Sequence, residues 1–187
     1  MYSLDIDKGL VREARWLESP NCDDRPEECL PELIVLHGIS LPPGEFGGGW
    51  IDQFFTNFLQ ADAHPYFGEI CEMQVSSHFL IRRDGELVQY VPLGRRAWHA
   101  GHSCFEGREG CNDFSVGIEL EGVDDSAYAD AQYAALAALI SALRVSVGSL
   151  ANASIVGHSD ISPGRKTDPG PAFDWPRLTR LLAKAEA

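Results

Sequence analysis

The sequence lacks a long hydrophobic run: its longest apolar stretch falls far short of the roughly 20 residues that a membrane-spanning helix needs. The N-terminal segment MYSLDIDKGLVREARW also lacks the basic start, apolar middle and small-residue cleavage site of a signal peptide. Low-complexity tracts and internal repeats are missing as well. We therefore expect a protein of the cytosol that does not enter a membrane.

Positive charge is scarce. The chain has 15 lysines and arginines against 28 aspartates and glutamates, so its formal net charge is -13. Such a surface repels nucleic acid and anionic lipid, which disfavours both as partners. It would also repel an anionic small substrate unless arginines gather at the site that binds it. No feature of the sequence indicates an obligate protein partner.

Cysteines are few and odd in number, five in all, and none of their spacings fits a zinc ribbon. Six residues separate Cys22 from Cys29, and six separate Cys104 from Cys111, so the spacing allows two small disulfide loops. A chain without an export signal favours free thiols instead.

The length and composition fit one domain over residues 1–187 with a core of its own. Apolar runs predict strands at 33–37, 115–122 and 154–158, and residues 76–93 predict a hairpin with a type I′ turn at Asp84-Gly85. Helical spacing predicts helices over 50–59 and 129–147, and Asp174 is placed to cap a last helix. These elements indicate an α/β fold in which helices flank a mixed central β-sheet, although the strand order stays open.

Two histidines share one local setting. His37 and His158 each end a short apolar strand and precede a loop rich in glycine and proline. With Asp168 they offer two nitrogens and one carboxylate oxygen, the three protein ligands of a catalytic zinc site that keeps an open position. Structural histidines held by hydrogen bonds are the alternative. Lys166, two residues before Asp168, would point the same way in an extended loop and could stabilise an oxyanion; a solvated loop lysine is the alternative.

Glu119 could supply the proton transfer that amide hydrolysis needs, because water must lose a proton and the departing amine must gain one. It lies on a predicted strand whose other face is apolar. Glu121 is the alternative on the same face, and either residue could be an exposed strand glutamate. We favour Glu119, which lies deeper in the strand.

Five motifs resemble the AmpD-type N-acetylmuramoyl-L-alanine amidases: LHGISLPPGEFGG, VSSHFLIRRDGELVQYVP, RAWHAG, CNDFSVGIELEG and GHSDISPGRKTDPGPAFDW. The resemblance runs from about residue 16 to residue 182. It implies the fold of phage amidase-lysozymes and peptidoglycan-recognition proteins, a mixed sheet flanked by helices. It also implies one zinc ion on His37, His158 and Asp168, with Glu119 and Lys166 as catalytic residues, in agreement with the assignment from the residues alone.

The resemblance further implies hydrolysis of the amide between the lactyl group of 1,6-anhydro-N-acetylmuramic acid and L-alanine, in cytosolic recycling of peptidoglycan. The substrate would be an anionic anhydro-muropeptide, which Arg165 is placed to meet despite the acidic surface. Trp98 and His99 of RAWHAG could line the sugar side, and Tyr66 could donate a hydrogen bond in the cleft. Core packing is the alternative for Trp98 and Tyr66.

Two positions depart from the family pattern. The family commonly has asparagine after its first zinc histidine, where this chain has Gly38, and arginine before VSAH, where this chain has Gln74. Both usual residues are associated with the peptide end of the substrate. We therefore predict relaxed discrimination at the diamino-acid residue of the stem peptide.

Three other functions compete with the cytosolic amidase. A non-catalytic muropeptide-binding module typically lacks the third metal ligand, whereas this chain keeps Asp168 together with Glu119 and Lys166. An exported amidase would carry a signal peptide or a wall-anchoring domain. A zinc hydrolase of another amide would not share motifs over nearly the whole chain.

Overall fold

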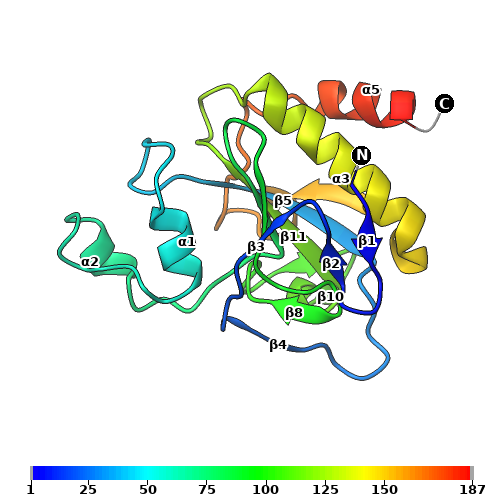
Figure 1. Ribbon diagram of the computed structural model, residues 1–187, viewed down its shortest axis with the longest axis horizontal. Helices are drawn as coiled ribbons and strands as arrows, with labels where there is room; N and C mark the ends of the chain where they lie inside the picture. The colour runs from blue at the N-terminus through cyan, green and yellow to red at the C-terminus, as the bar shows by residue number, and fades with distance from the viewer. Residues whose placement is uncertain (1, 186–187) are drawn as a thin grey trace.

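The computed structural model describes residues 2–185, and its centre is a six-stranded mixed sheet (Figure 1). In spatial order its strands are β12 (Ser154–Gly157), β5 (Leu33–Ile39), β11 (Ser115–Glu121), β6 (Phe79–Ile81), β7 (Leu87–Gln89) and β3 (Arg15–Trp16). The first four run parallel to one another, β7 is antiparallel to β6, and β3 is parallel to β7. The predicted strands and the α/β fold class are confirmed.

The turn of the β6–β7 hairpin differs from the prediction. Arg82 N donates to Glu86 O at 3.0 Å, so three residues, 83–85, form the loop. Gly85 alone of the three adopts a positive φ, of 90°, whereas a type I′ turn needs two such residues. Asp84 instead accepts the N–H of Glu86 through Oδ1 at 2.9 Å, which suits a type I turn followed by a left-handed glycine.

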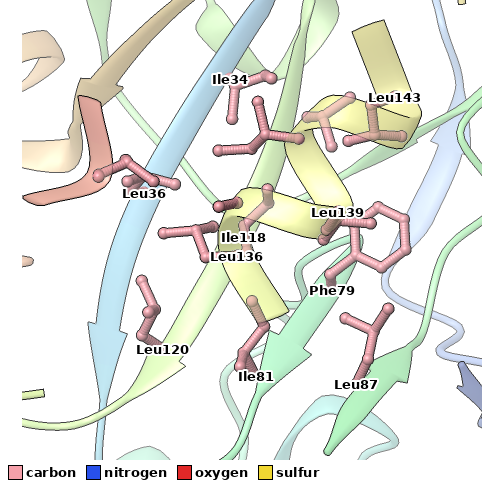
Figure 2. Close-up of a cluster of buried hydrophobic side chains, with 14 of the residues drawn as sticks. Ile34, Leu36, Phe79, Ile81, Leu87, Ile118, Leu120, Leu136, Leu139 and Leu143 are labelled. Atoms are coloured by element: carbon pink, nitrogen blue, oxygen red, sulfur yellow. The ribbon is translucent and has the colours of Figure 1, made fainter. Parts of the chain in front are cut away.

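Two helices, α3 (Asp130–Ser146) and α5 (Trp175–Ala185), lie side by side over one face of the sheet (Figure 1). Figure 2 shows the apolar side chains of β5, β11 and β6 pointing toward α3. Ile34, Leu36, Ile118 and Leu120 are fully buried in this cluster, as the alternation of the strands predicts. The predicted cap of α5 is confirmed, since Arg177 N donates to Asp174 Oδ1 at 2.8 Å.

The other face carries α1 (Trp50–Phe55), α2 (Phe67–Ile70) and α4 (His158–Ile161). Helix α1 ends four residues before its predicted end, because Asn57 has a φ of 63° and interrupts the helix. The same helical spacing predicts that Phe54, Phe55 and Phe58 all face the core. Phe54 and Phe55 are buried, but Phe58 is 69% exposed, so the prediction was wrong for Phe58.

Short elements complete the chain: β1 (Leu4–Asp5), β2 (Leu10–Val11), β4 (Cys22–Asp24), β8 (Arg95–Ala97), β9 (Cys104–Phe105), β10 (Arg108–Glu109) and 3₁₀ turns at Cys111–Asp113 and Gly148–Leu150. Strands of two or three residues are too short for an alternating pattern, so sequence periodicity missed them. All five cysteines are free. Within residues 2–185, no helix has the length and apolar character to cross a bilayer.

Candidate active site

The register of the parallel strands brings the predicted site residues together. Glu119 of β11 lies beside His37 of β5, so both side chains point to the sheet face opposite α3. Strand β12 pairs with the other edge of β5 and leads directly into His158, the first residue of α4. Asp168 follows on the loop between α4 and α5.

His37, His158 and Asp168 converge on one point. The two Nδ1 atoms of the histidines lie 2.9 Å apart, and Asp168 Oδ2 lies 3.2 Å from His37 Nδ1 and 3.1 Å from His158 Nδ1. Both histidines are buried, and burial lowers the pKa of His37 to about 4. Burial alone would raise the pKa of Asp168, but the neighbouring imidazoles of His158 and His37 bring it below its usual range.

This arrangement fits a metal ion. His158 Nε2 lies 3.1 Å from Ala100 O, which can only accept, so Nε2 carries the proton and Nδ1 presents a lone pair. Two imidazole nitrogens and a carboxylate oxygen packed this closely are stabilised when a cation lies between them. Ligand atoms of a tetrahedral zinc ion, at about 2.0–2.1 Å from the metal, are about 3.3 Å apart, close to the separations here. The group can therefore hold a divalent metal.

An open cavity of about 790 Å³ lies over the group. Its lining includes six further residues that the sequence singles out: Gly38, Tyr66, Trp98, His99, Glu119 and Lys166. A ligand in this cavity would therefore contact the candidate metal ligands and the candidate catalytic residues at once.

The two glutamates of β11 differ in their partners. Glu119 is 9% exposed, and its Oε2 has no hydrogen-bond partner among the described residues. Burial raises the pKa of Glu119 well above its usual value, Asp168 raises it further, and Lys166 opposes the shift. Glu121, by contrast, accepts the N–H groups of Gly47 and Arg83 at 2.6 Å and 3.2 Å. Glu119 is thus the carboxyl group that is free to exchange protons with a ligand.

The two basic residues of the GRKTD loop have different surroundings. Lys166 is exposed and lines the cavity. Arg165 Nη2 donates to Ala100 O at 2.6 Å, to His102 O at 2.8 Å and to Ser162 Oγ at 2.7 Å. Arg165 does not line the cavity, and its Nη2 supports the backbone at Ala100 and His102.

The remaining predicted substrate residues divide in the same way. Trp98 lines the cavity, and its Nε1 donates to Asp23 Oδ1 at 3.0 Å, which fixes the plane of the indole. Gln74 is exposed and does not line the cavity, although its neighbours Met73 and Val75 do.

Gly38 lies against Tyr128, a residue that sequence reasoning missed. A Cβ atom at position 38 would approach the Tyr128 hydroxyl to 2.5 Å, and that hydroxyl donates to Pro169 O at 3.0 Å. Tyr128 thus contacts the residue that follows Asp168. No spacing in the sequence could have revealed a contact between residues 41 positions apart.

Comparison with known proteins places these residues in a family. The family model of N-acetylmuramoyl-L-alanine amidases matches residues 27–171. The 1,6-anhydro-N-acetylmuramyl-L-alanine amidase AmpD of Salmonella typhimurium (strain SL1344) is 59% identical over 177 residues, which cover 95% of this chain and 94% of the relative. AmpD of Escherichia coli (strain K12) is 56% identical over 96% of this chain and 97% of its own length.

Solved structures agree with the sequence relatives. A crystal structure of a selenomethionine AmpD derivative superposes with a TM-score of 0.91 at 57% identity, over 94% of this chain and 98% of that chain. A complex of the amidase AmiD from E. coli with anhydro-N-acetylmuramic acid-L-Ala-D-gamma-Glu-L-Lys reaches a TM-score of 0.57 at 28% identity, over 84% of this chain and 60% of that chain.

Proposed function

Because the chain belongs to the N-acetylmuramoyl-L-alanine amidase family, we propose that it hydrolyses the amide between the lactyl group of 1,6-anhydro-N-acetylmuramic acid and L-alanine in muropeptides. Two observations carry this assignment together. The chain is 56–59% identical, over nearly its whole length, to 1,6-anhydro-N-acetylmuramyl-L-alanine amidases. It also has an intact His–His–Asp group beneath an open cavity. The reaction would serve cytosolic recycling of peptidoglycan.

We propose one zinc ion as the cofactor, held by Nδ1 of His37, Nδ1 of His158 and Oδ2 of Asp168. Two imidazoles and one carboxylate form a donor set that suits zinc. When bound, zinc supplies a Lewis acid that polarises the amide carbonyl and lowers the pKa of water.

Glu119 would move the protons of the reaction. Its carboxylate accepts a proton from the attacking water and returns it to the alanine nitrogen as the C–N bond breaks. The raised pKa of Glu119 makes it a stronger base for the first step and keeps the proton on the carboxyl group until the amine departs. Lys166 would stabilise the negative charge that develops on the carbonyl oxygen.

The substrate would occupy the cavity with its sugar against Trp98 and its peptide toward the end of β5. Trp98 offers an apolar face whose orientation Asp23 holds. Gly38 and Tyr66 are further cavity residues within reach of a peptide. Lys166 lines the cavity and offers the anionic substrate a cation, and Arg165, the preceding residue, would add a second.

Hydrolysis of anhydro-muramyl tripeptide by the purified protein, followed by mass spectrometry, tests the proposal. We expect free tripeptide, its loss after chelation and its return after zinc is added back. Asp168→Ala should lose the metal and the activity together, whereas Glu119→Ala should keep the metal and lose the activity. Intact substrate in every reaction, with zinc bound, would contradict the amidase and favour a muropeptide-binding module.

A further inference from the structure

The two candidate zinc histidines are oriented by two consecutive residues. His37 Nε2 lies 2.9 Å from His99 Nδ1, and His158 Nε2 lies 3.1 Å from Ala100 O. Both imidazole rings therefore turn Nδ1 toward Asp168 and Nε2 toward residues 99–100. A histidine that binds a metal through one nitrogen generally donates the proton of the other, which fixes its tautomer and the direction of its ring.

The backbone carbonyl of Cys111 determines which ring nitrogens of His99 and His37 carry protons. Ser115 Oγ donates its single hydrogen to Cys111 O at 2.6 Å, so it can only accept from His99 Nε2, which is 3.0 Å away. With its proton on Nε2, neutral His99 presents a bare Nδ1 that accepts from His37 Nε2. The Nδ1 lone pair of His37 is then free for a metal.

Residues 99–100 are anchored from several sides. Asn112 Oδ1 accepts the backbone N–H of His99 at 3.1 Å and that of Ala100 at 2.8 Å. The ring of His99 lies over Gly117 of β11, where a Cβ atom would approach its Cγ to 2.5 Å. Arg165 Nη2 also donates to the Ala100 carbonyl, at 2.6 Å. These contacts come from three separate parts of the chain and leave the segment little freedom.

We propose that His99 and Ala100, anchored by Asn112, form an orienting segment that fixes both metal-ligand histidines with Nδ1 available to the metal. The proposal rests on the zinc site proposed above. It makes His99 and Asn112 positioning residues, which act on the metal through His37 and His158, whatever contact the edge of His99 also makes with substrate in the cavity.

Two substitutions of His99 separate this role from simple packing. The side-chain oxygen of asparagine is attached to Cγ as Nδ1 is, so His99→Asn can still accept from His37 Nε2. The amide of glutamine reaches toward the Nε2 position beside Ser115, so His99→Gln offers His37 no acceptor. We expect His99→Gln to weaken zinc affinity about 10–100-fold, the usual effect of losing such a partner, and His99→Asn to stay within about threefold of the wild type.

The readout is the zinc dissociation constant from competition with a chromogenic chelator, which needs no substrate. Circular dichroism and urea unfolding of the metal-free proteins establish that both variants are folded. Equal loss in the two variants would overturn the proposal, because packing alone would explain it. Wild-type affinity in His99→Gln would overturn it as well, and so would loss confined to His99→Asn.

Asn112 provides a second, independent pair should the His99 variants unfold. Asn112→Asp keeps the oxygen that accepts both N–H groups, whereas Asn112→Ala removes it. We expect the alanine variant alone to lose zinc affinity, and equal affinities in the two would overturn the anchoring role. A wild-type protein that binds zinc and cleaves muropeptide, beside unaffected variants, would refute the orienting segment and leave the proposed function standing.

Discussion

The two faces of strand β11 show how one element serves stability and chemistry separately. Ile118 and Leu120 point to α3 and are fully buried among apolar side chains (Figure 2). Gly117, Glu119 and Glu121 point the opposite way and are buried too, but among histidines, carboxylates and arginines. Because side chains alternate along a strand, each face can change without displacing the other.

Within the polar face, the two glutamates differ again. Both carboxylate oxygens of Glu121 have partners: they accept the N–H groups of Gly47 and Arg83. Glu121 also forms an ion pair, in which its Oε1 lies 3.6 Å from Arg82 Nη1. Glu119 keeps a buried oxygen without a partner, which lowers the stability of the fold. A buried, unpaired carboxyl group with a raised pKa beside a cavity is typical of an active site.

The largest expected effect comes from Glu119→Gln, which keeps the shape of the side chain and removes its ability to take a proton. We expect the catalytic rate to fall about 10²–10⁴-fold, the usual contribution of a positioned acid or base. The thermal unfolding temperature should stay equal or rise, because a neutral amide is easier to bury than a carboxylate. The fall in rate is measured as kcat at saturating muropeptide, normalised to the zinc content of each protein.

Glu121→Gln is the matched control on the same face of the same strand. It weakens the pairing with Arg82 and should lower stability, while kcat per folded, zinc-loaded molecule stays within a few-fold of the wild type. The reverse pattern, with near wild-type kcat in Glu119→Gln and loss in Glu121→Gln, would assign the proton transfer to Glu121.

Ile118→Ala tests the apolar face. The side chain is fully buried, and removing a buried isoleucine typically costs about 2–5 kcal/mol of unfolding free energy. We expect that loss in urea unfolding, with kcat of the folded fraction nearly unchanged. A variant of normal stability and impaired kcat would show that the two faces of β11 are coupled.

The contrast between the faces also explains what the sequence could predict. Alternation in SVGIELEG is a local property, so it correctly separates Ile118 from Glu119. The His–His–Asp group was predictable for a similar reason, since each ligand lies at a recognisable strand end or motif. The resemblance to the amidases supplied the reaction, which the residue pattern alone left open.

Other features depend on contacts between distant segments and give no local signal. The order of the strands, the carbonyl of Ala100 behind His158, and the anchoring of Arg165 all belong to this class. Arg165 illustrates the point: its sequence neighbours suggest an anion contact, yet its tertiary neighbours are backbone acceptors. Helix α1 ended early because Asn57 adopts a left-handed backbone, which amphipathic spacing does not reveal.

The next largest effect is expected from substitution of Gly38, which is next to β11 in the sheet and also lines the cavity. It pairs with Leu120 and lines the cavity, and a side chain here would displace the Tyr128 hydroxyl from Pro169 O. Gly38→Asn should therefore lower kcat/KM up to about tenfold, since one such hydrogen bond contributes about 0.5–1.5 kcal/mol. Kinetics on tripeptide and shorter muropeptides would measure this loss together with the discrimination between stem peptides.

Tyr128→Phe is the control for that prediction, because it removes the same hydroxyl and adds no side chain in the cavity. Equal losses in the two variants would place the effect at Asp168, through Pro169. A loss in Gly38→Asn alone would place it in the cavity. Strong tripeptide selectivity in the wild type would contradict the relaxed discrimination that Gly38 and Gln74 predict.

The smallest effect is expected from substitution of Asp23, which accepts a hydrogen bond from the cavity residue Trp98. A hydrogen bond from Arg96 is the main cause that lowers the pKa of Asp23 to about 2, helped by Trp98. Because the folded pKa is below the ordinary 3.8, the pair stabilises the fold above that pH and loses its contribution as the pH falls toward 2. Asp23→Asn should thus lower unfolding free energy at pH 6 by less than about 1 kcal/mol, as exposed ion pairs do.

The difference in unfolding free energy between the wild type and Asp23→Asn, measured by urea unfolding, should be smaller at pH 3 than at pH 6. A difference that is the same at both pH values would mean that Asp23 acts through the shape of its hydrogen bonds to Trp98 and Arg96 rather than through its charge. Asp23 would then contribute to stability as the apolar face of β11 does, through packing and geometry rather than through charge. A smaller difference at pH 3, together with an unchanged KM for muropeptide at pH 7, would mean that the charge of Asp23 contributes to folding alone. The orientation of Trp98 would then depend on packing.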